Sequence, residues 1–158
     1  MTKQFVLVAL LAVALAVPSM AMAQAKPNFT GKWVQDMEKS DPAGGGGGGR
    51  GPAGPQTLTY TQTATELKID REGPNGVTST VYKLDGSPSE NAGRGGAVIS
   101  KTVWDGAKLV TSYSRTMGEN TVSVTETRSL EGDTLVVVSA MKGGPQGDTT
   151  RKIVFKKG

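Results

Sequence analysis

Apolar and polar residues alternate with a period of two along much of the chain. Between residues 121 and 130, Val122, Val124 and Leu130 share one face, and most of the positions between them carry hydroxyl groups. The stretch that begins at Leu109 repeats this alternation. Because successive side chains of a strand point to opposite faces, the pattern predicts antiparallel strands with one buried face. No segment has a sustained apolar period of 3.6 residues, so we expect at most one short turn of helix.

Turn residues separate the alternating segments. Asn75-Gly76 and Asp105-Gly106 are dipeptides typical of tight hairpins, and Gly132 marks a third turn. The strands expected between such turns cover 31–37, 56–62, 65–71, 77–84, 97–104, 107–115, 120–130, 133–141 and 149–156. Since most connections are too short for anything but a hairpin, strands that are neighbours in the sequence should be neighbours in space.

A meander of this kind can remove its exposed edges by closing on itself. We therefore predict an all-β fold, an antiparallel up-and-down β-barrel of about eight to ten strands, with a two-sheet β-sandwich as the alternative. Sixteen threonines and eleven valines lie between residues 56 and 158, and β-branched residues favour strands. In such a barrel we expect apolar side chains inside and hydroxyl groups outside.

The first residues have the layout of a cleavable signal peptide. Lys3 precedes a run of thirteen apolar residues, and the small residues Ala21 and Ala23 follow that run. The run is shorter than the roughly 20 residues that a membrane-spanning helix needs, which disfavours an uncleaved anchor. We expect cleavage before Gln24, or before Lys26, and an exported protein of the periplasm or the extracellular space without an integral membrane segment.

The mature chain is expected to form a single domain. After the signal peptide at 1–23, an N-terminal segment at 24–40 carries the first strand. Residues 41–55 form a glycine-rich flexible loop, because glycine pays a large entropic cost on ordering. Residues 56–158 supply the remainder of the barrel.

The composition excludes several classes of chemistry. The chain has no histidine and no cysteine, so it has no Ser-His or Cys-His nucleophile, no imidazole or thiolate metal site and no disulfide. No pair of carboxylates stands out by its spacing, and we expect no catalytic residues, no metal and no cofactor. The net charge of +4 is dispersed along the chain, which does not indicate a nucleic-acid partner. The oligomeric state stays open.

Three short motifs resemble one family of barrel proteins. Gly31-Lys32-Trp33 resembles the Gly-x-Trp signature on the first strand of lipocalins and fatty-acid-binding proteins, the calycin group. The hairpin at 104–108 and the strands at 132–137 and 153–157 resemble later elements of fatty-acid-binding proteins, in the same order. The resemblance implies a lipocalin-like barrel that binds a small hydrophobic or amphiphilic molecule.

The chain also departs from fatty-acid-binding proteins. Their last strand offers an Arg-x-Tyr pair to the lipid carboxylate, and the matching positions here are Ile153 and Phe155. Another cavity arginine of that family falls at Tyr113, with Arg115 two residues further along the same face. The glycine-rich loop stands where that family has a helical cap. Fatty-acid specificity therefore does not follow from the resemblance.

The candidate ligand-binding residues are aromatic residues, arginines and one methionine on predicted inward faces. They are Tyr60, Tyr82, Trp104, Tyr113, Arg115, Arg128, Met141, Arg151 and Phe155. Gly31 and Trp33 are expected to be structural, with the Trp33 ring packed under the core and its indole N–H hydrogen-bonded nearby. For Trp104 the alternative is shielding of a hairpin end, and for the tyrosines and Met141 it is ordinary filling of the core.

Each arginine on an inward face needs a partner, because burying an unpaired charge costs several kcal/mol. If Val122, Val124 and Leu130 point inward, Glu126 and Arg128 point inward with them. They then form an ion pair inside a wet cavity, or the charges lie at the barrel rim. In the first case the interior arginines favour an anionic head group on an otherwise apolar ligand.

Two functions follow from this pattern. The first is an exported binding protein for a small hydrophobic or amphiphilic ligand, which predicts an internal cavity of several hundred Å³. The alternative is a non-catalytic structural or protein-interaction barrel whose core is filled by its own side chains.

Overall fold

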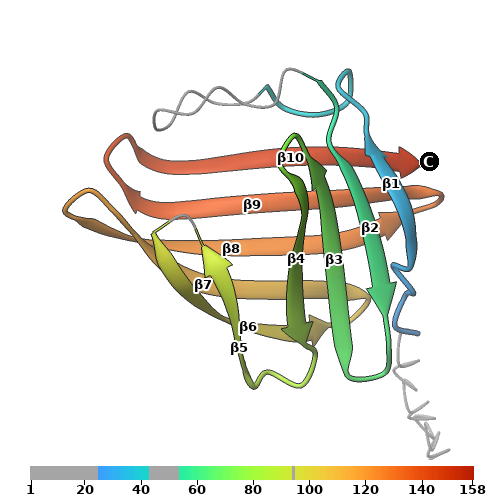
Figure 1. Ribbon diagram of the computed structural model, residues 1–158, viewed down its shortest axis with the longest axis horizontal. Coiled ribbons are helices and arrows are strands. Elements are labelled where there is room, and N and C mark those ends of the chain that lie inside the picture. Colours follow the sequence, from blue (N-terminus) through green and yellow to red (C-terminus); the bar gives the residue numbers. More distant parts are fainter. Residues whose placement is uncertain (1–24, 43–53, 94) are drawn as a thin grey trace, which may run out of the picture.

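The computed structural model describes residues 25–42, 54–93 and 95–158, which form ten β-strands and no helix (Figure 1). Those ranges contain no helix long and apolar enough to cross a membrane. The signal peptide expected at 1–23 and most of the glycine-rich loop lie outside the described residues.

All ten strands belong to one antiparallel sheet. Their bounds are β1 (Gly31–Gln35), β2 (Thr57–Gln62), β3 (Glu66–Gly73), β4 (Gly76–Lys83), β5 (Pro88–Gly93), β6 (Gly96–Asp105), β7 (Lys108–Met117), β8 (Asn120–Glu131), β9 (Thr134–Gly144) and β10 (Gly147–Lys157). The strand order is β4-β3-β2-β1-β10-β9-β8-β7-β6-β5, so all sequential strands are neighbours except β4 and β5. The first strand pairs with the last, and β4 does not form a ladder with β5.

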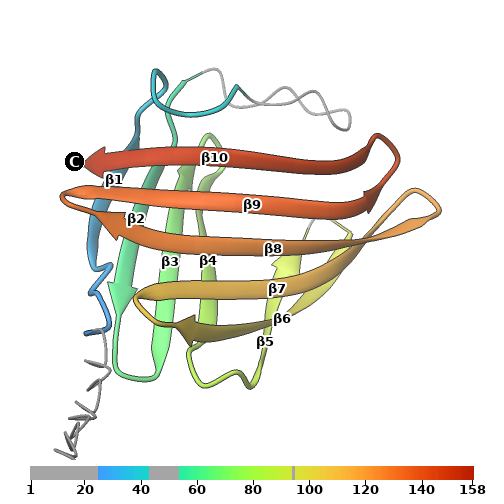
Figure 2. The same cartoon turned by 180° about the vertical axis from the view of Figure 1, so that it is seen from behind.

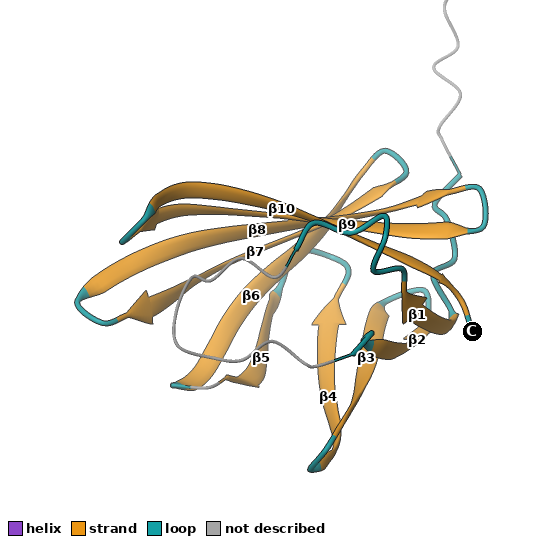
Figure 3. Ribbon diagram, turned by 90° about the horizontal axis from the view of Figure 1, so that it is seen from above, coloured by secondary structure: helices purple, strands orange, loops and turns teal. Residues whose placement is uncertain are grey.

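The sheet curls into a nearly closed barrel. β1 to β4 cross β7 to β10 at a steep angle, and the view from behind shows the same crossing (Figures 1 and 2). From above, the two halves diverge from the region where β1 and β10 meet (Figure 3). The prediction of an up-and-down barrel is confirmed, and the two-sheet sandwich is wrong because one continuous ladder joins all the strands.

The strand at Pro88–Gly93 was not expected from the sequence. Its proline, glycine, asparagine and serine residues are poor strand formers. It pairs with β6 over its full length, from Pro88 opposite Lys101 to Gly93 opposite Gly96. As a terminal strand of the sheet, β5 tolerates a proline at its first position.

Glycine conformations confirm the turns predicted between strands. Gly106 and Gly132 have φ values of +58° and +61°, and Gly76 has +106°. These left-handed conformations favour glycine because it has no Cβ. The described residues between β1 and β2, at 36–42 and 54–56, form no helix.

The N-terminal segment closes one end of the barrel. The ring of Phe29 is fully buried and stacks on Trp104, with 6.0 Å between ring centroids. The Trp33 indole N–H donates to the Phe29 carbonyl at 2.9 Å, and the Gln62 side chain accepts from the Phe29 N–H at 2.9 Å. Trp33 is therefore packed in the core at this end, since only 1% of it is exposed.

Side chains replace the missing ladder between β4 and β5. The Val81 N–H donates to Asn91 Oδ1 at 2.8 Å, and Asn91 Nδ2 donates to the Val81 carbonyl at 2.9 Å. The Lys83 N–H donates to Ser89 Oγ at 2.8 Å. This junction, formed by Val81, Lys83, Ser89 and Asn91, is called the seam below.

Candidate binding site in the barrel interior

The inward side chains form rows that run across neighbouring strands. Register places Ile153, Val137, Arg128, Leu109 and Trp104 in one row, from β10 to β6. The end of the barrel beneath this row is closed by the buried core around Phe29 and Trp33. Arg128 is therefore the single charged residue of this row, at the margin of the apolar core.

The next row toward the other end of the barrel carries a polar side chain on each strand from β10 to β6. Its residues, from β10 to β6, are Arg151, Ser139, Glu126, Thr111 and Thr102. We call this set the polar row. One row further out lie Thr149, Met141, Val124, Tyr113 and Ser100. The polar row thus lies between the row that contains Arg128 and a mixed row that carries Met141 and Val124.

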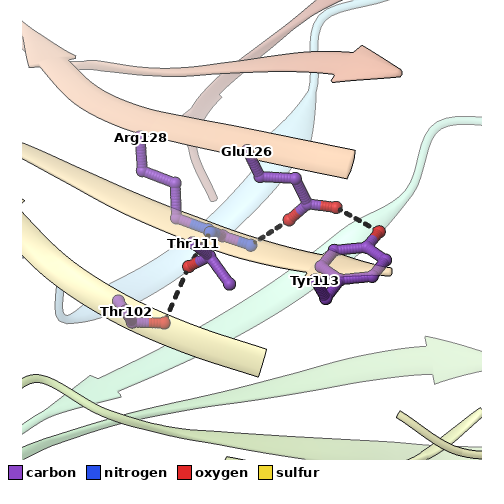
Figure 4. Close-up of polar contacts among 5 residues, drawn as sticks. All are labelled: Thr102, Thr111, Tyr113, Glu126 and Arg128. Atoms are coloured by element: carbon purple, nitrogen blue, oxygen red, sulfur yellow. Dashed lines mark hydrogen bonds and ion pairs between the residues drawn. The ribbon is translucent and has the colours of Figure 1, made fainter. Parts of the chain in front are cut away.

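Four side chains of β6 to β8 form a connected network with Arg128 (Figure 4). Arg128 Nη2 forms an ion pair with Glu126, and Arg128 Nη1 donates to Thr111 Oγ1 at 3.1 Å. Thr111 Oγ1 in turn lies 2.9 Å from Thr102 Oγ1, and the Tyr113 hydroxyl donates to Glu126 at 3.1 Å. Only Arg128 Nε of the guanidinium is buried without a hydrogen-bond partner among the described residues.

Burial explains the electrostatics of this network. Burial alone lowers the pKa of the Arg128 guanidinium, but the Tyr60 phenol and the Glu126 carboxylate raise it, and the net pKa lies above its usual range. Burial raises the pKa of Tyr60, which Arg128 partly offsets. Burial and then the Glu126 charge raise the pKa of Tyr113. Arg128 is therefore a permanent cation, and the nearby Tyr60 and Tyr113 stay neutral at physiological pH.

The opposite side of the barrel covers the Arg128 guanidinium with tyrosine. Arg128 Cζ lies 5.3 Å from the centroid of the Tyr82 ring, a cation–π contact. Tyr60, on β2, is 2% exposed and belongs to the buried core. Both tyrosines were candidate ligand contacts, and the structure places both beside Arg128.

The other two candidate arginines lie in different surroundings. Arg115 is exposed at the far end of β7, where its Nη2 lies 3.7 Å from Met141 Sδ. Arg151 is half-buried in the polar row, and its Nε is buried without a hydrogen-bond partner. The sequence left open whether such charges are paired inside or lie at the rim. Arg128 is paired inside with Glu126, and Arg115 lies at the rim.

Two candidates belong to the closed end rather than to the polar row. Phe155 is 2% exposed and packs in the core, and Trp104 lies partly buried against Phe29. Lys26 Nζ lies 5.5 Å from the centroid of the Trp104 ring. Trp104 therefore packs against Phe29 at the closed end, beside the turn of its own hairpin.

The expectation that hydroxyl groups lie outside is wrong for part of the chain. Thr102 and Thr111 are fully buried, and Ser100 and Ser89 are also buried. The interior threonines hydrogen-bond to each other, and Thr111 also accepts from Arg128, which offsets the cost of removing them from water. Period-two alternation assigns Thr111 to the inner face, but threonine is so frequent in this chain that no signal set these two apart.

Among the hollows on the surface of the described residues, two share Ile99 of β6. One, of about 560 Å³, is lined mostly by outward-facing residues of β6, β7 and β8, among them Ile99 and Ser112. The other, of about 350 Å³, lies over the seam and includes Glu90 and again Ile99. Neither is the internal cavity that the sequence predicts. The described residues also contain no group of three or more acidic side chains that could hold a metal ion.

Solved structures with this architecture are known. The zebrafish ileal bile acid-binding protein complexed with cholic acid has a TM-score of 0.65 and 19% identity, covering 82% of this chain and 98% of that chain. The chain has the calycin fold.

The structural likeness extends to other members of this fold. Fatty-acid-binding protein 1 of Echinococcus granulosus has a TM-score of 0.61 and 17% identity, covering 82% of this chain and 96% of its own. Human cRBP IV has a TM-score of 0.60 and 17% identity, with coverages of 84% and 99%. No protein-family model and no curated protein matches the sequence.

Proposed function

We propose that this calycin barrel is an exported binding protein for a small amphiphilic molecule. The polar part of the ligand lies against the polar row, and its apolar part lies against Val122, Val124 and Met141, nearer the other end of the barrel. Val122 and Val124 are buried and Met141 is half-buried, so these side chains supply an apolar wall. Binding requires no catalytic group.

The polar row is the observation that carries this proposal. A buried ion pair of this kind is no better for stability than well-packed apolar residues, because desolvation costs several kcal/mol per ion. Polar groups on five adjacent strands, with Arg128 at 4% exposure beside them, are expensive for a barrel that needs only a core. Orienting a polar head group accounts for them, since ligand sites combine apolar walls with a few placed polar groups.

The structural neighbours support the same class of ligand. One was solved with cholic acid, and another is named a fatty-acid-binding protein. Both kinds of molecule join an apolar body to a polar end. The Ile153 and Phe155 positions on β10 argue against a copy of the fatty-acid clamp, because Phe155 is buried in the core and neither side chain binds a carboxylate.

Saturable binding tests the proposal directly. We expect 11-(dansylamino)undecanoic acid to gain fluorescence on titration with the mature protein and to be displaced by cholate. Native mass spectrometry of protein purified from its own host should show a bound small molecule that is lost on denaturation. Absence of both signals would remove the proposal.

Export is tested by the mass of the mature chain. The Lys3 n-region, the apolar run and the small residues Ala21 and Ala23 support cleavage. We expect the N-terminus of the secreted protein to be Gln24 or Lys26. A protein that retains its first residues and stays inside the cell would contradict export and leave the binding proposal unaffected.

A filled barrel that acts through its outer face is the second candidate. The two surface hollows favour it, because both lie outside the barrel and share the exposed Ile99, which is 60% exposed. This candidate predicts no uptake of an amphiphilic probe. It also predicts that replacing Ile99 by a charged residue disrupts a protein complex that replacements on the polar row leave intact.

A further inference from the structure

The two interior arginines beside the polar row differ in whether their charge is already compensated. Arg128 forms an ion pair with Glu126, donates to Thr111 and lies against the Tyr82 ring. An incoming anion would have to displace Glu126 from a guanidinium whose side chain is only 4% exposed. Arg128 is therefore occupied by the protein itself.

Arg151 has no such partner. All fourteen aspartate and glutamate residues lie within the described ranges, and none of them forms an ion pair with Arg151. Its Nε is buried and makes no hydrogen bond within the part of the chain that the structure describes. A guanidinium that is half-buried and unpaired lacks both full hydration and a counter-charge, and it gains from an anion that brings acceptor oxygens.

The position of Arg151 suits a ligand that lies along the barrel. It shares the inward face of β10 with Ile153 and Phe155, and register places it opposite Ser139, which in turn lies opposite Glu126. Glu126 is held by Arg128 and by Tyr113, so its charge is compensated on its own side. The Ser139 hydroxyl makes no hydrogen bond with the described residues. Ser139 lies opposite Arg151 on the neighbouring strand β9.

We propose that Arg151 receives the charged head group of an anionic amphiphile, with a carboxylate as the head group and Ser139 as a second donor, while Arg128 is a structural cation. This inference rests on the proposed function and names its ligand class. It separates the two arginines, because only one of them has a free charge to offer. Arg115, exposed at the rim, is left to contact solvent.

A pair of probes that differ only in charge tests the assignment. We use 11-(dansylamino)undecanoic acid and its methyl ester, and we measure the ratio of their dissociation constants for the full mature protein. The wild type should favour the acid by about tenfold, the magnitude of one charge-assisted hydrogen bond. Arg151→Gln should bring the ratio close to one by weakening the acid alone, and Arg151→Lys should retain most of the preference.

Lys152→Gln is the matched control, because it removes one cation from the same strand on the outer face, where Lys152 is exposed. Its ratio should equal that of the wild type. An unchanged ratio in Arg151→Gln, with both probes still bound, would overturn the assignment and leave the proposed function intact. If the wild type binds neither probe, the proposed function fails and the assignment with it.

Two further arms complete the experiment. Acetate in large excess should not displace the acid, because the apolar chain supplies much of the binding; displacement by acetate would mean that Arg151 takes free anions and not an amphiphile. If Arg151→Gln is poorly folded, an NMR titration of the wild type takes its place. The Arg151 Nε–H resonance is assigned by its absence from the spectrum of Arg151→Lys. That signal should shift with the acid and not with the ester, and equal shifts with both would overturn the assignment.

Discussion

The carboxamide of Asn91 bonds both backbone polar groups of Val81, as a peptide group of a paired strand would. The distances, 2.8 and 2.9 Å, are those of ordinary ladder hydrogen bonds. One side chain thus substitutes for a missing stretch of β-ladder between β4 and β5. The barrel is closed there by a few side chains, in contrast to the continuous ladders elsewhere.

Asn91→Leu should open the seam. It removes a donor and an acceptor and leaves the Val81 N–H and carbonyl without partners, at a cost of about 1–3 kcal/mol in the free energy of unfolding. Hydrogen exchange should show faster exchange of the Val81 amide, while amides of β8 and β9 keep their protection. Asn120→Leu is the control, because Asn120 is exposed and its side chain makes no hydrogen bond with the described residues. Unchanged Val81 protection would mean that the seam does not depend on Asn91.

Arg128→Met should be among the most destabilising single changes. It leaves Glu126, whose side chain is 21% exposed, without its ion-pair partner, and breaking a buried pair costs about 3–5 kcal/mol. Combining Arg128→Met with Glu126→Gln should cost less than the single change, because no charge is then unpaired. Urea unfolding of the four proteins of this cycle measures the coupling.

The exposed pair of Lys68 and Asp70 is the control for that cycle. Its atoms lie 3.0 Å apart, but the Lys68 side chain is 48% exposed. The corresponding cycle with Lys68→Gln and Asp70→Asn should give a coupling of about 1 kcal/mol or less. A coupling as small as this at Glu126 and Arg128 would contradict the interior placement of that pair.

Alkaline titration should report the raised pKa values of all three tyrosines of the chain. Burial is the main cause that raises the pKa of Tyr60, Tyr82 and Tyr113 above the ordinary value of 10.0. The folded state then binds more protons than the unfolded state above pH 10, so this contribution to stability is complete below pH 10 and is lost as the pH rises. Ultraviolet absorbance of tyrosinate should therefore appear above pH 10 and together with unfolding. Ordinary titration of one tyrosine in the folded protein would place that residue in water.

Trp33→Phe should cost more than Trp104→Phe. The first change removes the donor to the Phe29 carbonyl at the closed end, which leaves that carbonyl buried and unpaired, at about 1–3 kcal/mol. The Trp104 indole makes no hydrogen bond with the described residues, and phenylalanine can still stack on Phe29. Thermal unfolding followed by circular dichroism compares the two, and equal costs would deny the Trp33 hydrogen bond an energetic role.

The strand pattern was predictable because hydrophobic alternation and turn residues act locally. Gly106 and Gly132 adopt the positive φ values that their turns require, and the expected strands occur within a few residues of their predicted bounds. β5 was missed because the residues Pro88–Gly93 have little strand preference of their own, and pairing with β6 makes them a strand.

For the site, the alternation of apolar and polar residues predicted only which side chains point into the barrel. The pattern on β8 placed Glu126 and Arg128 on the inner face, and the structure brings them together as an ion pair. It could not reveal that Thr111 accepts from Arg128, since that contact depends on the register between β7 and β8 and on the rotamers of both side chains. From the sequence, Arg128 and Arg151 were equally good candidates for ligand binding. Only their hydrogen-bond and ion-pair partners in the structure distinguish them.

The covalent chain and the hydrogen-bonded ring are interrupted at different places. The first and last strands, β1 and β10, are paired in the middle of the strand order, whereas the ring is open between β4 and β5, which a short loop joins. A circular permutant that begins at β5 and ends at β4, with the old ends linked, would keep every ladder. In this permutant each strand would pair with the strand synthesised just before it. The sheet would then form without any pairing between the first and the last strand.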